Sequence, residues 1–114
     1  MNLETQPNER RCSFTESAHI FRIQGACPVS DNPQKGSELT IKYIPDEYVL
    51  EVAALKKFLD SFIGGRGEVR SMEGMIQTIA KECSEILKVD VEVLADLIIK
   101  PGPQGMRLTC KHVY

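Results

Sequence analysis

The alternation of apolar and polar residues along the chain predicts four β-strands. Apolar side chains recur at every second position in four runs, near residues 18–24, 39–44, 91–99 and 106–112. Because successive side chains of a strand point to opposite faces of a sheet, each run predicts a strand with one buried face. Pro45 ends the second run, and the Pro-Gly-Pro-Gln-Gly sequence at 101–105 joins the last two. We therefore expect an antiparallel pair with a long connection, followed by a hairpin.

Two segments between these pairs carry the spacing of amphipathic helices. Near 50–62, apolar residues stand at positions i, i+3, i+4 and i+7, and glycines follow. Near 72–87 the same spacing recurs, with Ser71 as the expected N-cap. The predicted order is ββααββ. This order predicts an α+β fold in which two helices cover one face of a four-stranded antiparallel sheet.

The chain length fits one such domain. Of its 114 residues, the polar and aperiodic segment 1–17 is expected to be a flexible arm, and residues 18–114 to form the domain. A four-stranded sheet has two open edges, which invite pairing with other subunits. Association is also expected because a domain of this size has a small core.

Composition excludes several classes of function. Fourteen basic and sixteen acidic residues give a net charge of -2, which argues against a strongly basic nucleic-acid surface. No apolar run is long enough to span a bilayer, and the start of the chain lacks the apolar core of a signal peptide, so no membrane association and a cytoplasmic location are expected. None of the four cysteines forms a CxxC pair and only two histidines are present, so no metal site is predicted.

Cys27 is the strongest candidate for a reactive side chain. It follows the first strand in the loop Gly-Ala-Cys-Pro-Val-Ser-Asp-Asn-Pro at 25–33, where small residues leave room for a ligand. A thiolate there would attack carbonyl or nitrile carbons, with Asp31 or Glu38 as the acid/base nearest in sequence. The alternative is that Cys27 is only a small loop residue. Cys83 and Cys110 fall on apolar faces and are expected in the core.

Glu73 is the candidate for ligand binding. It opens the second predicted helix, where a carboxylate complements the helix dipole without any ligand. Alternatively, it could accept two parallel hydrogen bonds from the N–H groups of a guanine-like ring. A modest basic group has the same two interpretations, a solvated face or a contact with phosphate; it comprises Lys42, Lys56, Lys57, Arg66 and Arg70.

Several of these segments together resemble one family. The Cys27-Pro-Val-Ser30 segment, the strand ending Tyr43-Ile-Pro45, the helix from Glu51, the glutamate Glu73 and the turn at 99–105 resemble, in order and spacing, the QueF and QueF-like family. That family contains 7-cyano-7-deazaguanine (preQ0) reductases and archaeosine-forming amidinotransferases. It has the tunnelling fold, whose ββααββ units close into barrels, so the resemblance implies a homo-oligomer of stacked rings, a decamer.

The resemblance also implies a chemistry for these residues. Cys27 would attack the nitrile of preQ0 to give a thioimide, Glu73 would hold the guanine-like edge, and Ser30 and Glu51 would contribute to substrate binding. In the reductases NADPH then delivers two hydrides. In the QueF-like relatives ammonia attacks the thioimide instead, and preQ0 in tRNA becomes archaeosine.

The chain departs from the reductase pattern at several positions. Ala53 stands where the helix motif has lysine, Gln34 or Lys35 stands at the place of an aspartate after the cysteine, and Met72 replaces a histidine. Asp31 or Glu38 would then substitute for that aspartate. The sequence-based expectation is an amidinotransferase that uses ammonia and no cofactor. The alternatives are an NADPH-dependent nitrile reductase and a non-catalytic oligomer that binds a purine or pterin.

Overall fold

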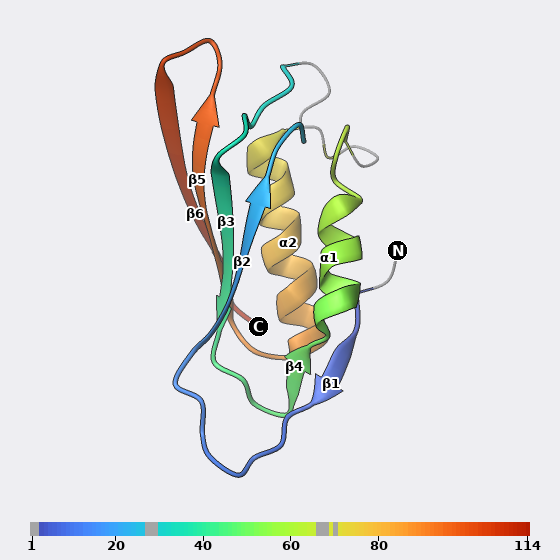
Figure 1. Ribbon diagram of the computed structural model, residues 1–114. Helices are drawn as coiled ribbons and strands as arrows, with labels where there is room; N and C mark the ends of the chain where they lie inside the picture. The colour runs from blue at the N-terminus through green and yellow to red at the C-terminus, as the bar shows by residue number, and fades with distance from the viewer. Residues whose placement is uncertain (1–2, 27–29, 66–68, 70) are drawn as a thin grey trace.

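The computed structural model describes residues 3–26, 30–65, 69 and 71–114. These described residues form six strands and two helices, arranged as in Figure 1. In chain order they are β1 (Thr5–Pro7), β2 (Ser17–Ile23), β3 (Ser37–Tyr43), β4 (Tyr48–Leu50), α1 (Val52–Asp60), α2 (Met72–Leu87), β5 (Val91–Ile99) and β6 (Gln104–His112).

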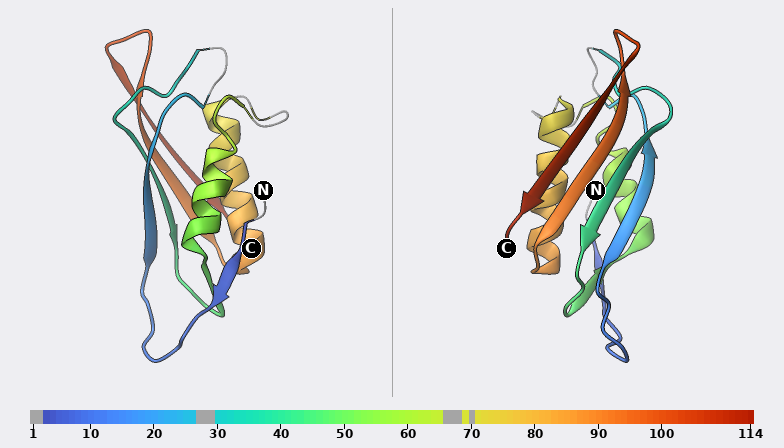
Figure 2. Two further views of the ribbon diagram at one scale, coloured as in Figure 1. Left: turned by 45° about the vertical axis from the view of Figure 1, so that its right-hand side comes forward. Right: turned by 90° about the vertical axis from the view of Figure 1, so that its left-hand side faces the viewer.

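The main sheet has four antiparallel strands in the order β2-β3-β5-β6. Both helices lie on one face of it, as the two views of Figure 2 show. The structure therefore confirms the predicted α+β class and the ββααββ arrangement of its main elements. It also places β2 and β6 at the two edges of the sheet.

The core lies between this sheet and the helices. Leu39, Ile41 and Val93 point from the inner strands to the helices and are fully buried. Their neighbours Thr40 and Lys42 point to the opposite, helix-free face and keep part of their surface in solvent. The alternation of buried and accessible residues is the pattern expected of strands covered on one side only.

The N-terminal segment departs from the sequence-based expectation. Residues 5–7 form strand β1, which pairs with β4 as a separate two-stranded ribbon. The Asn8 N–H donates to Glu47 O at 3.0 Å, and the Glu51 N–H donates to Glu4 O at 3.0 Å. The prediction of a flexible arm over 1–17 is therefore wrong at β1. Strands of three residues are too short to produce a readable alternation, and their backbone pairing leaves no signal in the side chains.

Because of the same ribbon, the first helix begins later in the chain than the sequence predicts. The predicted helix near 50–62 begins at Val52, because Leu50 belongs to β4 and Glu51 is the N-cap. The second helix covers the predicted range 72–87, and Ser71 is its N-cap as expected. Over the described ranges, no helix is both long and apolar enough to cross a membrane.

Candidate functional site

The candidate site is the loop between β2 and β3. Cys27, Pro28 and Val29 lie outside the described residues, and the structure describes the chain on both sides of them. The Gly25 N–H donates to Pro33 O at 2.9 Å, which closes the base of the loop. The Gly64 N–H donates to Gly25 O at 3.2 Å and so ties the loop to the segment after α1. The loop is therefore anchored at the end of the sheet where α1 ends and α2 begins.

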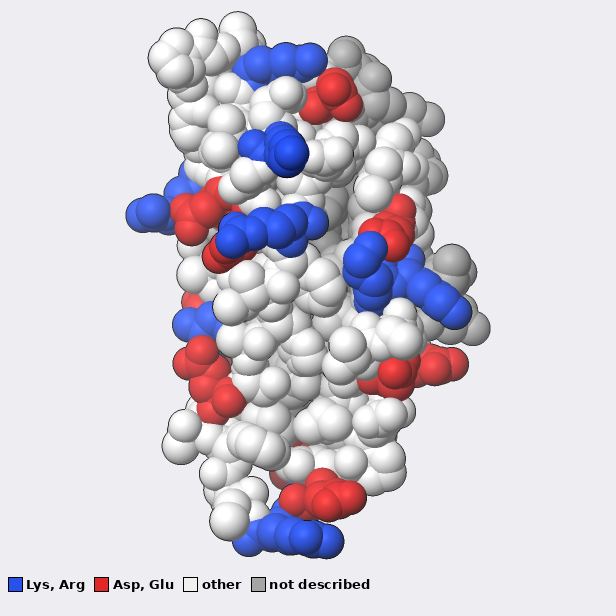
Figure 3. Space-filling model, viewed as in Figure 1, with Lys and Arg blue, Asp and Glu red and all other residues white. Residues whose placement is uncertain are grey.

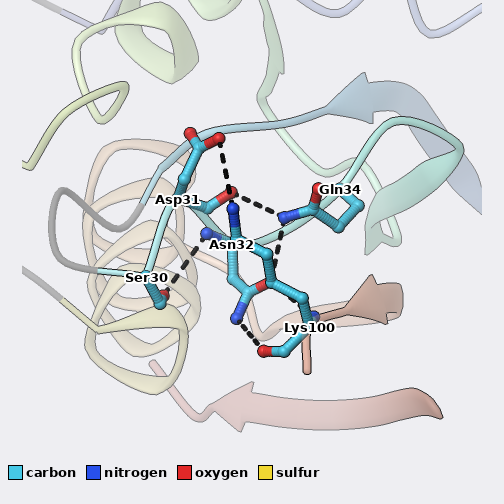
Figure 4. Close-up of polar contacts among 5 residues, drawn as sticks. All are labelled: Ser30, Asp31, Asn32, Gln34 and Lys100. Carbon is cyan, nitrogen blue, oxygen red and sulfur yellow. Dashed lines mark hydrogen bonds and ion pairs between the residues drawn. The ribbon is translucent and has the colours of Figure 1, made fainter. Parts of the chain in front are cut away.

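A network of polar contacts shapes the second half of the loop (Figure 4). Asn32 Nδ2 donates to Lys100 O at 2.9 Å, and the Lys100 N–H donates to Asn32 Oδ1 at 2.9 Å. The Asn32 N–H donates to Ser30 Oγ at 3.3 Å. Gln34 Nε2 donates to Asp31 O at 2.9 Å and to Asn32 Oδ1 at 3.1 Å. These bonds connect the loop with the turn of the β5–β6 hairpin.

Of the two predicted acid/base residues, only Asp31 belongs to this loop network. Its backbone is left-handed, with φ of 57°, a region that aspartate tolerates better than most residues. Its side chain is 74% exposed, and Oδ2 lies 3.9 Å from Lys100 Nζ. The carboxylate of Asp31 is therefore accessible to solvent and lies beside an ammonium group.

Glu38 lies elsewhere. It alternates along β3 with the buried Leu39, so it points to the helix-free face of the sheet. There it forms an ion pair with Arg22 of the neighbouring strand β2. The structure therefore separates Glu38 from the network that holds Asp31.

Glu73 is exposed in the first turn of α2, as predicted. Ser71 caps this helix by accepting the Gly74 N–H at 3.0 Å, so the Glu73 carboxylate is not needed as the cap. It lines a hollow of about 160 Å³ between α2 and the edge strand β6, together with Ile76, Gln77, Leu108, Thr109 and Cys110. A carboxylate beside apolar and amide side chains can accept hydrogen bonds from a planar heterocycle.

A second hollow, of about 170 Å³, borders Ala26 immediately before Cys27. It lies between the edge strand β2 and α1, and most of its lining is apolar, including Phe21, Leu59, Phe62 and Met75. The hollow at Ala26 opens beside β2 and the hollow at Glu73 beside β6, the opposite edges of the sheet. Within one chain, the hollow that borders Ala26 and the hollow that Glu73 lines therefore lie at different edges of the sheet.

Glu51 is the N-cap of α1, the helix that it precedes. Its two carboxylate oxygens accept the N–H groups of Ala53 at 3.0 Å and Ala54 at 2.6 Å. The Ala54 N–H, and then the Ala53 N–H, hold the pKa of this carboxyl below its ordinary value. The role of Glu51 in substrate binding stays a prediction, whereas its role as the N-cap of α1 is observed.

Of the two cysteines expected in the core, Cys83 is fully buried and Cys110 is not. Cys83 is buried in the core, and burial raises the pKa of its thiol to about 12, so it remains protonated and inert. Cys110 is only half-buried, because it lines the hollow beside Glu73 on an edge strand. Cys12 is exposed.

The basic residues singled out from the sequence do not gather within the described part of the chain. Lys42 lies 3.5 Å from Glu92 on the helix-free face, and Lys56 lies 2.6 Å from Asp60 on α1. Figure 3 shows basic and acidic side chains next to one another on the face it presents, and not one continuous basic surface. Arg66 and Arg70 lie outside the described residues. The described residues also contain no group of three His, Cys, Asp or Glu side chains arranged to hold a metal ion.

Sequence reasoning missed two residues of the loop network. Asn32 stands before a proline in a segment of turn-forming residues, a pattern that predicts a turn but gives no partner. Lys100 contributes its main chain, which carries no sequence signal, and lies 68 positions away. Only the fold brings the two together.

Comparison with known proteins points to one family. The model of a family described as "QueF-like protein" matches residues 36–107, more than half of the chain. A protein named NADPH-dependent 7-cyano-7-deazaguanine reductase, from a Nitratiruptor species, is 33% identical over 61 residues. That alignment covers 54% of this chain and 46% of the relative, so the chain matches about half the length of that protein. The family match begins at Gly36 and leaves the Cys27 loop outside it.

Proposed function

Because the chain belongs to the QueF-like family, we propose that it acts on the nitrile of preQ0 carried in tRNA and converts it to the amidine of archaeosine. The family match is the observation that carries this proposal. The bond from the Gly25 N–H to Pro33 O supports it, because this bond holds together the two ends of the sequence segment that contains Cys27. The named relative supports the choice of a 7-cyano-7-deazaguanine as the substrate class.

The proposed reaction has two steps. The Cys27 sulfur adds to the nitrile carbon, the displaced π electrons move to the nitrogen, and the nitrogen takes up one proton to give a thioimide. Ammonia then adds to the thioimide carbon, and the C–S bond breaks to release the amidine and the thiol. The net change is the addition of one ammonia molecule across the nitrile, with no oxidation or reduction.

Asp31 is the proposed proton-transfer group. It belongs to the same loop as Cys27, it is exposed, and its carboxylate lies beside Lys100 Nζ. Glu38, the other candidate, is held by Arg22 on the opposite face of the sheet. We assign the guanine-like edge to Glu73, whose carboxylate is accessible at the start of α2 and is not used as the helix cap.

A site shared between two copies of the chain accounts for the separation of the hollow at Ala26 from the hollow at Glu73. The strands β2 and β6 run antiparallel to each other, because three antiparallel pairings separate them. The edge strand β6 of one copy can therefore continue antiparallel with β2 of the next, and repetition closes a barrel. Such pairing would bring the hollow at Glu73 beside the hollow at Ala26, which supports the proposal of a ring-shaped oligomer.

The first helix supports ammonia rather than NADPH as the co-reactant. Ala53 has no charged atom at the motif position where the reductases are expected to have lysine. Lys56, the next basic residue, is held by Asp60 through contacts of 2.6 Å to both carboxylate oxygens. Lys57, the other basic residue of α1, is exposed in the last turn of the helix, so the preference for ammonia rests on Ala53. No step of the proposed reaction passes through NADPH.

A second candidate function is binding without turnover. Gln34 or Lys35 stands where the family resemblance places an aspartate, and the amide nitrogen of Gln34 donates to Asp31 O and Asn32 Oδ1. An amide cannot take up and release a proton at neutral pH as a carboxylate does. If Asp31 does not carry out the proton transfer in place of that aspartate, the oligomer would hold a purine-like ligand and leave it unchanged.

Product analysis separates these proposals. The protein is incubated with preQ0-containing tRNA or with free preQ0, in the presence of ammonium or of NADPH, and the products are identified by mass. The proposal predicts that tRNA with ammonium gains the mass of one ammonia molecule. A gain of four hydrogen atoms with NADPH would establish the reductase instead, and unchanged ligand retained by the protein would favour the binding function.

A further inference from the structure

We propose that Gln77 is a second recognition residue of the hollow that Glu73 lines, and that its amide donates a hydrogen bond to the 6-carbonyl oxygen of a 7-deazaguanine. This inference rests on the proposed function, because it takes a 7-deazaguanine as the ligand and Glu73 as the acceptor of its N–H groups. Both residues lie on α2, within the described part of the chain.

Glu73 and Gln77 are polar side chains at the start of α2 that the helix itself does not use. Ser71 Oγ accepts the Gly74 N–H at 3.0 Å, and Thr78 Oγ1 donates to Gly74 O at 2.7 Å. Glu73 and Gln77 are exposed, and neither has a hydrogen-bond partner among the described residues. Both side chains are therefore available to a ligand.

The two side chains project from the same face of α2. Residues four apart in a helix are neighbours, with their Cβ atoms about 5–6 Å apart. Both line the hollow of about 160 Å³ between α2 and β6, where Ile76 and Leu108 supply apolar surface. A flat ring can therefore contact the apolar side chains while its polar edge meets Glu73 and Gln77.

The carboxylate and the amide together complement the polar edge of guanine. On that edge a 7-deazaguanine has N–H donors at N1 and at the 2-amino group, followed by the carbonyl acceptor at C6. The ionised Glu73 can accept from both donors but has no proton to donate to the carbonyl. The Gln77 amide has two N–H donors and can supply the missing one. The pair would therefore select a ring with both a 2-amino group and a 6-carbonyl.

Binding of three bases that lack the nitrile tests this role without any covalent step. The first is 7-deazaguanine. In the second, its 6-thio analogue, a weakly accepting sulfur replaces the oxygen, and the third, 7-deazahypoxanthine, lacks the 2-amino group. Isothermal titration calorimetry measures their dissociation constants with native protein, Gln77→Ala and Gln77→Glu. Lys81→Ala is the matched control, because Lys81 is exposed one turn further along α2 and is not among the described residues that line the hollow.

Gln77→Ala is expected to weaken the binding of 7-deazaguanine by about threefold to tenfold, the effect of one lost hydrogen bond. The 6-thio analogue should lose much less affinity, so the native preference for the 6-carbonyl should disappear. The preference for the 2-amino group depends on Glu73 and should remain. Gln77→Glu should bind 7-deazaguanine more weakly than Gln77→Ala, because a carboxylate has no proton to donate and repels the carbonyl oxygen. Lys81→Ala should bind all three bases as native protein does.

Several results would overturn the proposed contact. An equal loss of affinity for all three bases in Gln77→Ala would show that Gln77 acts only by orienting Glu73. Unchanged affinity for 7-deazaguanine in that variant would remove any role in recognition. Failure of native protein to bind both the free bases and a tRNA that carries 7-deazaguanine would reject the contact as well.

The outcomes for Gln77 and for the proposed function are distinguishable. If the selective loss is seen but preQ0 is converted neither as the free base nor in tRNA, the amidine-forming function fails and the recognition role of Gln77 stands. If preQ0 in tRNA is converted but Gln77→Ala keeps the preference for the 6-carbonyl, the function stands and the role of Gln77 is rejected.

Discussion

At the scale of single residues, three carboxylates that look alike in the sequence have different partners in the fold. Asp31 lies in the Cys27 loop beside Lys100, Glu38 pairs with Arg22 on the far face of the sheet, and Glu51 caps α1. Side-chain chemistry alone cannot distinguish them, because each is an acidic residue near a predicted element boundary or loop. Their different surroundings lead to different expected effects of substitution.

Replacement of Asp31 should affect the reaction, and replacement of Glu38 should not. A positioned acid/base group contributes about 10²-fold to 10⁴-fold in rate, so Asp31→Asn should slow amidine formation by at least about 100-fold. Glu38→Gln removes a carboxylate of the same charge from a different place and is the matched control. Rates of product formation from preQ0-tRNA and ammonium measure both. Equal losses in the two variants would contradict the assignment of Asp31.

The cap formed by Glu51 should make stability depend on pH. The pKa of Glu51 is lower in the folded chain than its ordinary value of 4.5. The contribution of the ionised carboxylate to the free energy of unfolding is therefore fully present above that ordinary value. The contribution is lost as the pH falls through the lower folded value. Glu51→Gln should therefore melt at a lower temperature than native protein at pH 7, and the difference should shrink in acid.

Thermal melts between pH 7 and pH 3 test this dependence. Glu85→Gln, on the exposed side of α2, removes the same charge away from a helix N-terminus and serves as the control. A difference between Glu51→Gln and native protein that stays constant across this range would show that the charge of Glu51 does not stabilise α1.

At the scale of elements, long periodic segments could be predicted and short ones could not. The sixteen residues of α2 repeat their apolar spacing over several turns, and this repetition defined both ends of the helix. The strands β1 and β4 have three residues each, and they are held by backbone pairing that no side-chain pattern records. The contact of Asn32 with Lys100 could not be predicted from the sequence either, because Lys100 takes part through its main-chain N–H and carbonyl groups. Glu73 could be placed because it follows a recognisable N-cap.

The β1–β4 ribbon should contribute to stability. Deletion of residues 1–8 removes the pairing of β1 and the flanking bonds from Asn8 to Glu47 and from Glu51 to Glu4. At about 0.5–1.5 kcal/mol net for each hydrogen bond, the loss of these two flanking bonds should lower the free energy of unfolding by about 1–3 kcal/mol. Urea denaturation measures it. Thr5→Ala keeps the backbone pairing and is the control; a deletion as stable as this control would show that the ribbon is dispensable.

At the scale of the whole molecule, the open sheet edges are the dominant feature. Each edge strand carries an arginine that an inner strand neutralises, Arg22 with Glu38 and Arg107 with Asp96. Because each of these arginines is paired with a carboxylate, the two arginines do not make the sheet edges of neighbouring copies repel one another. The helix-free face also exposes apolar surface, including Ile20, which is 62% exposed on β2. A closed barrel would pair both edges and cover this face.

The mass of the native protein in solution tests this assembly. A monomer has a mass of 12.8 kDa, and the proposed pair of stacked rings predicts ten times that value. Size-exclusion chromatography with light scattering distinguishes the two directly. A monomer at micromolar concentration would leave the hollows at Ala26 and Glu73 at opposite edges of one chain, and the shared site would be rejected.

The central claim is that Cys27 is a nucleophile for the nitrile of a 7-deazaguanine. Intact mass spectrometry of the native protein after incubation with preQ0 tests it most directly. The proposal predicts a mass increase equal to one preQ0 molecule, located at Cys27 by peptide mapping and absent from Cys27→Ala, while Cys12→Ala still forms it. A native protein that stays unmodified both with free preQ0 and with preQ0-containing tRNA, or an adduct that persists in Cys27→Ala, would contradict the claim.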